Sequence, residues 1–223
     1  MENKPNIMYL IIFDLDGTLL DSEASVLPGV QEALKNVGLP PSRDDFILSL
    51  MGENTKNFCT ELLSSYGDDG MDKYDDFLQA LWVAEAKHIK IHGRLFPGIP
   101  NILERLSNQG HTLAICSNAT TDYIDYVLYT QNITGYFDFI KSADDMESKV
   151  HGIKELIESS GDLRTIMIGD RYHDLEAAKE NSIQFIGALY GYGKDEISEA
   201  EFLAETPKDI IYILEEPLDD NKR

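Results

Sequence analysis

Short apolar runs alternate along the chain with longer stretches in which apolar residues recur at helical spacing. The short runs predict buried strands, and they cover Ile7–Phe13, Thr112–Cys116, Phe137–Ile140, Thr165–Ile168 and Ile183–Leu189. The longer stretches predict helices, at Ile99–Leu106, Thr121–Thr130, Lys149–Ser159 and Asp174–Asn181. Strand and helix in strict alternation are typical of an α/β fold, a parallel sheet with helices on both faces.

The alternation is interrupted once, between Asp21 and Arg94. This segment has no convincing strand and three helical stretches, at Val30–Val37, Thr55–Ser64 and Tyr74–Ile91, with Pro28-Gly29 and Pro97-Gly98 as punctuation. We therefore expect two domains: a core of residues 1–20 and 95–223, and an all-helical cap of residues 21–94 inserted after the first strand. The last nine residues, Glu215–Arg223, are mostly polar or acidic and are expected to fray.

The charge balance restricts the partners. The chain carries 19 Lys+Arg against 40 Asp+Glu, a formal net charge of −21. An acidic surface repels nucleic acid and anionic lipid, so neither is expected as a partner. The first apolar run is too short to span a bilayer and lacks the flanks of a signal peptide. Two cysteines without metal-ligand spacing suit a reducing compartment, and we expect a cytoplasmic protein, a monomer or a weak homodimer.

Two acids follow the first predicted strand directly, in Asp14-Leu-Asp16-Gly-Thr18. Ligands of open α/β sheets bind beyond the carboxyl ends of the strands. Carboxylates two residues apart in an extended segment can point into one cleft. Asp14 could then attack phosphorus, and Asp16 could protonate the leaving oxygen and later activate water. An ordinary Asp-Gly turn is the alternative interpretation of this pentapeptide.

Two more strand ends finish in polar residues. Ser117-Asn118 follows the second predicted strand, where a hydroxyl and nearby N–H groups could hold phosphate oxygens. Asp170 follows the fourth, and Asp174 begins the next helix, where it could equally be an N-cap. Asp14, the main-chain carbonyl of Asp16 and Asp170 make an all-oxygen set of the kind that suits Mg²⁺.

Together with Lys149, which begins a helix after an acidic run, these segments resemble the haloacid dehalogenase superfamily. The resemblance rests on four signatures in order, across nearly the whole chain: Asp14-Leu-Asp-Gly-Thr-Leu19, Ser117, Lys149, and Gly169-Asp170 with Asp174. It implies a Rossmann-like core, and a helical insertion after the first signature looks like the superfamily's commonest cap. Val150 follows the lysine where proline is usual, so Lys141 remains an alternative to Lys149.

The resemblance also implies roles. Asp14 would be the nucleophile that forms an aspartyl-phosphate, and Asp16 the general acid and base. Ser117, Asn118 and Lys149 would hold the phosphoryl group. Asp14, Asp16 and Asp170 would bind Mg²⁺, and Asp174 would bind it directly, through water, or by orienting Asp170.

The group most similar to this chain is the phosphoglycolate phosphatase-like one, so we expect a Mg²⁺-dependent phosphatase acting on a small phosphorylated metabolite. Phosphoglycolate, sugar phosphates and nucleotides all remain open as substrates. Dehalogenation is disfavoured because dehalogenases lack the second acid, Asp16. A phosphomutase and a non-catalytic ligand-binding member of the superfamily are the alternatives. We expect the cap to select the substrate, through the segment Met51–Lys56 above all.

Overall fold

The structure, a computed structural model, describes residues 7–161 and 163–215. The predicted fraying beyond Glu215 lies outside these residues. The described residues form one six-stranded sheet in the order β3-β2-β1-β4-β5-β6, and every neighbouring pair is parallel. The strands are β1 (Tyr9–Phe13), β2 (Thr112–Cys116), β3 (Phe139–Lys141), β4 (Arg164–Gly169), β5 (Gln184–Ala188) and β6 (Phe202–Ala204). This is the doubly wound Rossmann-like order, in which ligands bind where the strand order reverses, here at the carboxyl ends of β1 and β4.

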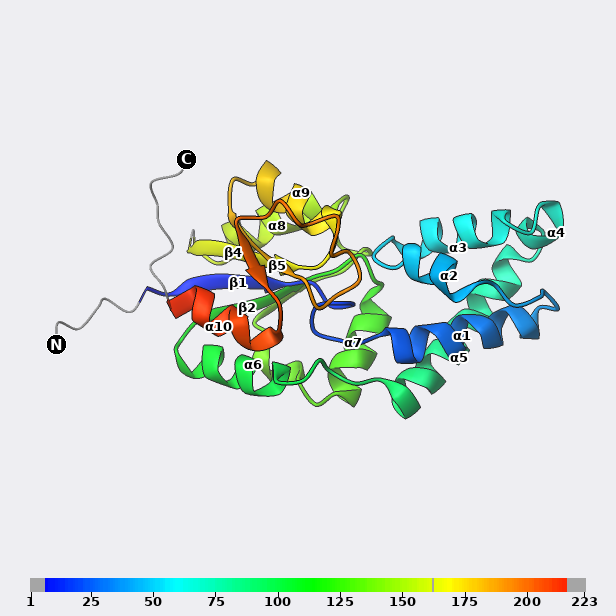
Figure 1. Cartoon of the computed structure of the whole chain (residues 1–223), viewed down its shortest axis with the longest axis horizontal. Coiled ribbons are helices and arrows are strands. Elements are labelled where there is room, and N and C mark those ends of the chain that lie inside the picture. Colours follow the sequence, from blue (N-terminus) through cyan, green and yellow to red (C-terminus); the bar gives the residue numbers. More distant parts are fainter. Residues whose placement is uncertain (1–6, 162, 216–223) are drawn as a thin grey trace.

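Helices cover both faces of the sheet (Figure 1). Successive side chains of a strand point to opposite faces, so Leu10 and Ile12 pack in one hydrophobic cluster and Ile11 and Phe13 in another. The first face is covered by α8 (Lys149–Ser159) and α9 (Tyr172–Glu180). The second is covered by α6 (Ile99–Asn108), α7 (Thr121–Thr130), a 3₁₀ turn (Thr134–Tyr136) and α10 (Pro207–Glu215). Because both faces are covered, β1 is buried along its whole length.

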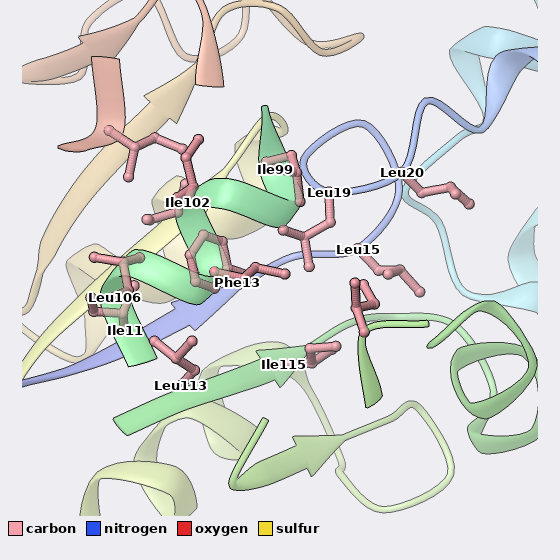
Figure 2. Packing of buried hydrophobic residues seen from close by; sticks show 14 of the residues in the cluster. Ile11, Phe13, Leu15, Leu19, Leu20, Ile99, Ile102, Leu106, Leu113 and Ile115 are labelled. Atoms are coloured by element: carbon pink, nitrogen blue, oxygen red, sulfur yellow. The ribbon is translucent and has the colours of Figure 1, made fainter. Parts of the chain in front are cut away.

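Helix α6 shows why the sequence folds in this way. Its apolar residues recur at three- and four-residue spacing and form one buried stripe of Ile99, Ile102, Leu103 and Leu106. Figure 2 shows that stripe against Phe13 of β1 and the side chains of β2. Full burial of each such side chain stabilises the fold by about 1.5–3 kcal/mol.

Five helices, all within the described part of the chain, form a separate helical insertion, residues 23–92, beyond the carboxyl ends of the strands (Figure 1). They are α1 (Glu23–Asn36), α2 (Asp44–Ser49), α3 (Thr55–Ser64), α4 (Asp68–Met71) and α5 (Tyr74–His92). Helices α1 and α5 pack along each other, and the insertion has its own hydrophobic cluster, with Val30, Leu34 and Phe77 fully buried. The two connecting segments meet where the Asp21 amide donates to the Arg94 carbonyl oxygen at 2.9 Å.

The predicted fold class, an α/β parallel-sheet core with an all-helical insertion, is confirmed. The predicted start of the first helix is wrong: α1 begins at Glu23 and contains Pro28. Proline removes only one helical hydrogen bond and lies here within the first two turns of the helix. The buried side chains of Val26 and Val30, on either side of Pro28, anchor the helix in the insertion's cluster.

Strand β6 and the helices α2, α4 and α10 are absent from the sequence prediction. One or both ends differ from the prediction by one or two residues in β1, β3, β4, β5, α5, α6 and α9. Within the described residues, no helix combines the length and the apolar character that crossing a membrane requires.

Candidate active site

The loop after β1 places Asp14 at the junction of β1 and β4. The Asp14 amide donates to the Ile168 carbonyl oxygen at 2.9 Å, which continues the strand pairing up to the first acid. The chain then turns at Gly17, whose φ of +80° favours glycine. A Cβ atom at Gly17 would lie 2.3 Å from Oδ2 of Asp170, so glycine also allows the close approach of the two loops.

Lys149 reaches this junction from the other side. It is the first residue of α8, and Ser148 caps the helix by accepting a hydrogen bond from the His151 amide. The Lys149 ammonium lies 2.8 Å from Oδ1 of Asp14 and 2.6 Å from Oδ1 of Asp174. Burial opposes its charge, but Asp14 and Asp174 outweigh burial and raise the pKa of Lys149 above its ordinary value. Lys141, the alternative lysine, instead pairs with Glu155 at 2.7 Å.

Three buried carboxylates share the junction with that lysine. Asp14, Asp170 and Asp174 are 4%, 0% and 0% exposed, and each offers an oxygen within 4.8 Å of the others. Oδ2 of Asp170 accepts the Tyr192 amide at 2.8 Å, and Oδ1 accepts the Thr18 hydroxyl at 3.2 Å. Fixed, closely spaced carboxylate oxygens are the donors that a hard divalent cation such as Mg²⁺ prefers.

Lys149 neutralises only part of the negative charge that the three carboxylates bring to the junction. Burial, with a smaller contribution from Asp174, raises the pKa of Asp14 to about 7 in spite of Lys149. Burial and the neighbouring Asp14 also raise the pKa of Asp170 well above its ordinary value. Buried carboxylates are stable as anions only beside a compensating charge, so the residues present fit a bound cation.

Asp174 belongs to the first turn of α9, which begins at Tyr172. Its Oδ2 accepts the Arg171 amide at 3.1 Å, as the inner partner of a capping box. The interpretation of Asp174 as an N-cap is therefore wrong, because Arg171 holds that position. Its second oxygen binds Lys149, so Asp174 joins the helix start to the acidic cluster.

Ser117 and Asn118 lie beside the same junction, after β2. Ser117 is 3% exposed, and its Oγ accepts the Ala119 amide at 3.3 Å. The Asn118 side-chain amide donates to the Gly52 carbonyl oxygen of the helical insertion at 2.8 Å. Asn118 thus contacts the insertion in this structure, and its role in phosphate binding stays a prediction.

Asp16 faces a partner that the sequence analysis did not single out. The Tyr123 hydroxyl, from the first turn of α7, donates to Oδ1 of Asp16 at 2.8 Å. Burial raises the pKa of Asp16, and the hydrogen bond from Tyr123 opposes this rise. Tyr123 lies outside the recognised signatures, and only the packing of α7 brings it to Asp16.

A cavity of about 390 Å³ lies between the core and the helical insertion. Its size is within the roughly 300–1,000 Å³ range of ligand pockets. The core contributes Asp14, Asp16, Ser117, Asn118 and Tyr123, among others, and the insertion contributes the remaining wall, including Met51, Gly52, Glu53, Thr55, Phe58, Trp82 and Glu85. Part of the segment Met51–Lys56 therefore lines the cavity, and its role in selecting the substrate stays a prediction.

Arg171, just before α9, and His173, in its first turn, connect the core to the insertion. The Arg171 guanidinium donates to the Met51 and Ser49 carbonyl oxygens, and its Nε lies 2.9 Å from Glu196. Nε2 of His173 lies 3.1 Å from Oε1 of Glu53. The sequence places both residues between the two acids of the last signature, but nothing in it shows what they contact.

The family model of the haloacid dehalogenase-like hydrolases matches residues 11–188. The chain belongs to this family. Among curated relatives of the hydrolase, a phosphoglycolate phosphatase of Aquifex aeolicus is 26% identical over 214 residues, with 93% of this chain and 97% of its own length covered. A 5′-nucleotidase of Pseudomonas aeruginosa is 29% identical over 208 residues, with 88% of each chain covered.

Solved structures show the same architecture. A haloacid dehalogenase-like family hydrolase from Streptococcus pneumoniae superposes on this hydrolase with a TM-score of 0.79 at 25% identity, over 95% of this chain and 100% of its own. A predicted phosphoglycolate phosphatase from Haemophilus somnus reaches a TM-score of 0.87 at 22% identity, over 95% and 100%. At the latter identity the likeness shows the fold alone. The prediction of family and enzyme class, a hydrolase, is confirmed.

Proposed function

We propose that this hydrolase is a Mg²⁺-dependent phosphatase that cleaves a small phosphate monoester through an aspartyl-phosphate on Asp14. The proposal rests on one observation, the junction of three carboxylates and a lysine. Asp14, Asp170 and Asp174 offer oxygens within 4.8 Å of one another, and Lys149 pairs with Asp14. The names of the curated relatives, phosphoglycolate phosphatase and 5′-nucleotidase, support phosphate monoesters as the substrate class.

Asp14 would act first, as the nucleophile. A carboxylate oxygen of Asp14 attacks phosphorus, and the bond from phosphorus to the leaving oxygen breaks. Asp16 donates its proton to that oxygen, so the alcohol leaves neutral. The Tyr123 hydroxyl donates to Oδ1 of Asp16 at 2.8 Å and would so orient the carboxyl group for this transfer.

Asp16 would then reverse its role. As a carboxylate it takes a proton from a water molecule, and the resulting hydroxide attacks phosphorus and releases Asp14 and inorganic phosphate. Over both steps an ester and water give an alcohol and phosphate, and Asp16 ends protonated as it began.

Positive charge around the phosphoryl group would be supplied locally. Phosphoryl transfer is catalysed mainly by positioning and by neutralising charge on the equatorial oxygens. Mg²⁺ held by Asp14, the carbonyl oxygen of Asp16, Asp170 and Asp174 would supply part of that charge, and would also favour the ionised form of Asp14. Lys149 would supply the rest, with Ser117 and Asn118 as neutral donors.

Residues 21–94 would act as a cap. The cavity between core and insertion encloses Asp14 and Asp16, and a closed cap excludes water until the alcohol has left. The insertion supplies much of the cavity wall, so its residues would contact the leaving group, while the core would contact the phosphate.

Phosphate release from a panel of small esters, with Mg²⁺ and with chelator, tests the proposal. We expect release only with metal, and loss of at least about 10³-fold in the Asp14→Asn variant, because an amide cannot form the aspartyl-phosphate. Asp125→Asn is the matched control, since Asp125 is exposed on α7 and no hydrogen bond or ion pair is seen for it with the described residues. An active Asp14→Asn variant would refute the mechanism, and inactivity of the wild type on every ester would refute the phosphatase.

A further inference from the structure

The cavity that holds Asp14 has a one-sided charge. Six acids of the described chain line it, two at the reacting end and four beyond: Asp14, Asp16, Glu53, Glu85, Asp122 and Asp144. Among the described residues, no lysine, arginine or histidine lines this cavity. Two nearby cations bind other groups: Lys149 binds Asp14 and Asp174, and Arg171 binds the insertion loop and Glu196. Lys56 and His173 line an adjoining pocket instead. A second negative charge on a substrate in this cavity would therefore lie among carboxylates, with no lysine, arginine or histidine of the described residues in the cavity wall.

Glu85 is the acid best placed to contact the leaving group. It lies on α5 in the insertion and lines the cavity with Asp16 and Tyr123. Asp16 is close enough to raise the pKa of Glu85, although burial is the larger cause of that rise. Because Asp16 would protonate the leaving oxygen, the next atoms of the leaving group would lie on the side of Glu85.

Glu85 also has no partner within the part of the chain that the structure describes. No hydrogen bond or ion pair joins its carboxyl group to those residues, whereas Glu53 has His173 and Asp144 accepts the Thr121 amide. A partly buried carboxyl group without a partner can gain a hydrogen bond from a ligand at little cost to the protein. The wall beside it is apolar, with Phe58, Leu81 and Trp82 from the insertion.

We propose that the substrate is a phosphate monoester whose leaving group has no negative charge and donates a hydrogen bond, as a hydroxyl or an ammonium, to the Glu85 carboxyl group. Esters of polyols, sugars and amino alcohols fit this description, and phosphoglycolate, whose leaving group carries a carboxylate, does not. The inference rests on the proposed phosphatase activity and narrows its substrate class. It also separates this chain from what the names of its phosphoglycolate phosphatase relatives suggest.

Three two-carbon esters of matched size test the inference: 2-hydroxyethyl phosphate, 2-aminoethyl phosphate and phosphoglycolate. The assay is run at pH 9, above the pKa of about 8 that burial gives Glu85, so that its carboxyl group is ionised. We expect kcat/KM in the wild type to be at least about tenfold higher for the first two esters, because a hydrogen bond to a charged group is worth about 1.5–3 kcal/mol and like charges repel. In Glu85→Lys the order should reverse in favour of phosphoglycolate. Glu61→Lys is the control, since Glu61 is exposed on α3 and the variant makes the same change in net charge.

Hydrolysis of p-nitrophenyl phosphate in the same assay distinguishes failure of the substrate inference from failure of the phosphatase proposal. If the wild type hydrolyses it but prefers phosphoglycolate or treats the three esters alike, the substrate inference is overturned and the phosphatase stands. If the wild type hydrolyses no ester, the phosphatase fails and the inference falls with it. An equal shift in Glu61→Lys and Glu85→Lys would also overturn the inference, because it would trace the preference to net charge alone.

Discussion

Replacing Glu85 with glutamine should change how the stability of the metal-free protein depends on pH. Burial, and Asp16 to a lesser degree, raises the pKa of Glu85 from 4.5 to about 8 in the folded chain. Between these values the unfolded chain has released the proton that the folded chain still holds. The stabilising contribution of this group is therefore complete below pH 4.5 and is lost as the pH rises through 8. A glutamine side chain does not titrate in this range, so the Glu85→Gln variant lacks this loss.

The size of the effect follows from that pKa. Roughly 2.5 pH units separate pH 5.5 from a pKa of about 8, and each unit corresponds to about 1.36 kcal/mol. The difference in free energy of unfolding, Glu85→Gln minus wild type, should therefore increase by up to roughly 3 kcal/mol between pH 5.5 and pH 9. Asp14 and Asp170 also have raised pKa values, but both proteins contain them. Their contributions cancel in the difference.

Urea denaturation at several pH values, with chelator present, measures this difference, and Glu61→Gln is the exposed control. A difference between Glu85→Gln and wild type that stays constant from pH 5.5 to pH 9 would refute the reasoning. It would mean that Glu85 is ionised in the folded chain throughout, and that water or an unseen partner solvates it. A pH dependence in Glu61→Gln would point to the whole charge of the chain instead.

Three further changes follow from the contacts. Tyr123→Phe removes the hydrogen bond to Asp16, so kcat should fall about tenfold, with KM little changed, in steady-state assays. Gly17→Ala places a Cβ atom 2.3 Å from Asp170 at a φ of +80°, so calorimetry should show Mg²⁺ affinity weakened at least about tenfold. Leu106→Ala empties a fully buried position, and chemical denaturation should show a loss of about 2–5 kcal/mol with no change in KM.

The sequence predicts the sheet well where its strands are long and buried on both faces. The first two predicted strands are the clearest, because continuous apolar runs end abruptly in polar residues, as at Phe13-Asp14. β3 is found although it has only three partly buried residues at the sheet edge, because Phe139 and Ile140 follow Phe137 closely. β6 is missed because it has three residues within an acidic stretch and pairs only at the sheet edge, with β5. The start of α1 is predicted too late for a related reason. Pro28 has a low helix propensity, but the packing of α1 in the insertion's hydrophobic cluster keeps the helix continuous through it.

In the candidate site, too, the sequence predicts some residues and misses others. Residues at strand ends, such as Asp14, Ser117 and Asp170, are accessible to sequence reasoning because parallel strands bring their carboxyl ends to one edge. Glu85 and Tyr123 are not, because their places depend on how α5 and α7 pack. The sequence places Asn118 at a strand end and predicts phosphate binding for it, but it does not show that the Asn118 side-chain amide donates to the Gly52 carbonyl oxygen of the insertion.

The segment 170–174, which comprises the short loop after β4 and the first residues of α9, contacts both the acidic cluster and the insertion. Asp170 and Asp174 face the cluster, whereas Arg171 and His173, which alternate with them in the chain, bind the insertion at residues 49–53. The Arg171 amide in turn donates to Asp174. Movement of the insertion away from the core would break the Arg171 and His173 contacts. Because the Arg171 amide also orients Asp174, we expect opening of the cavity to loosen the proposed cation site.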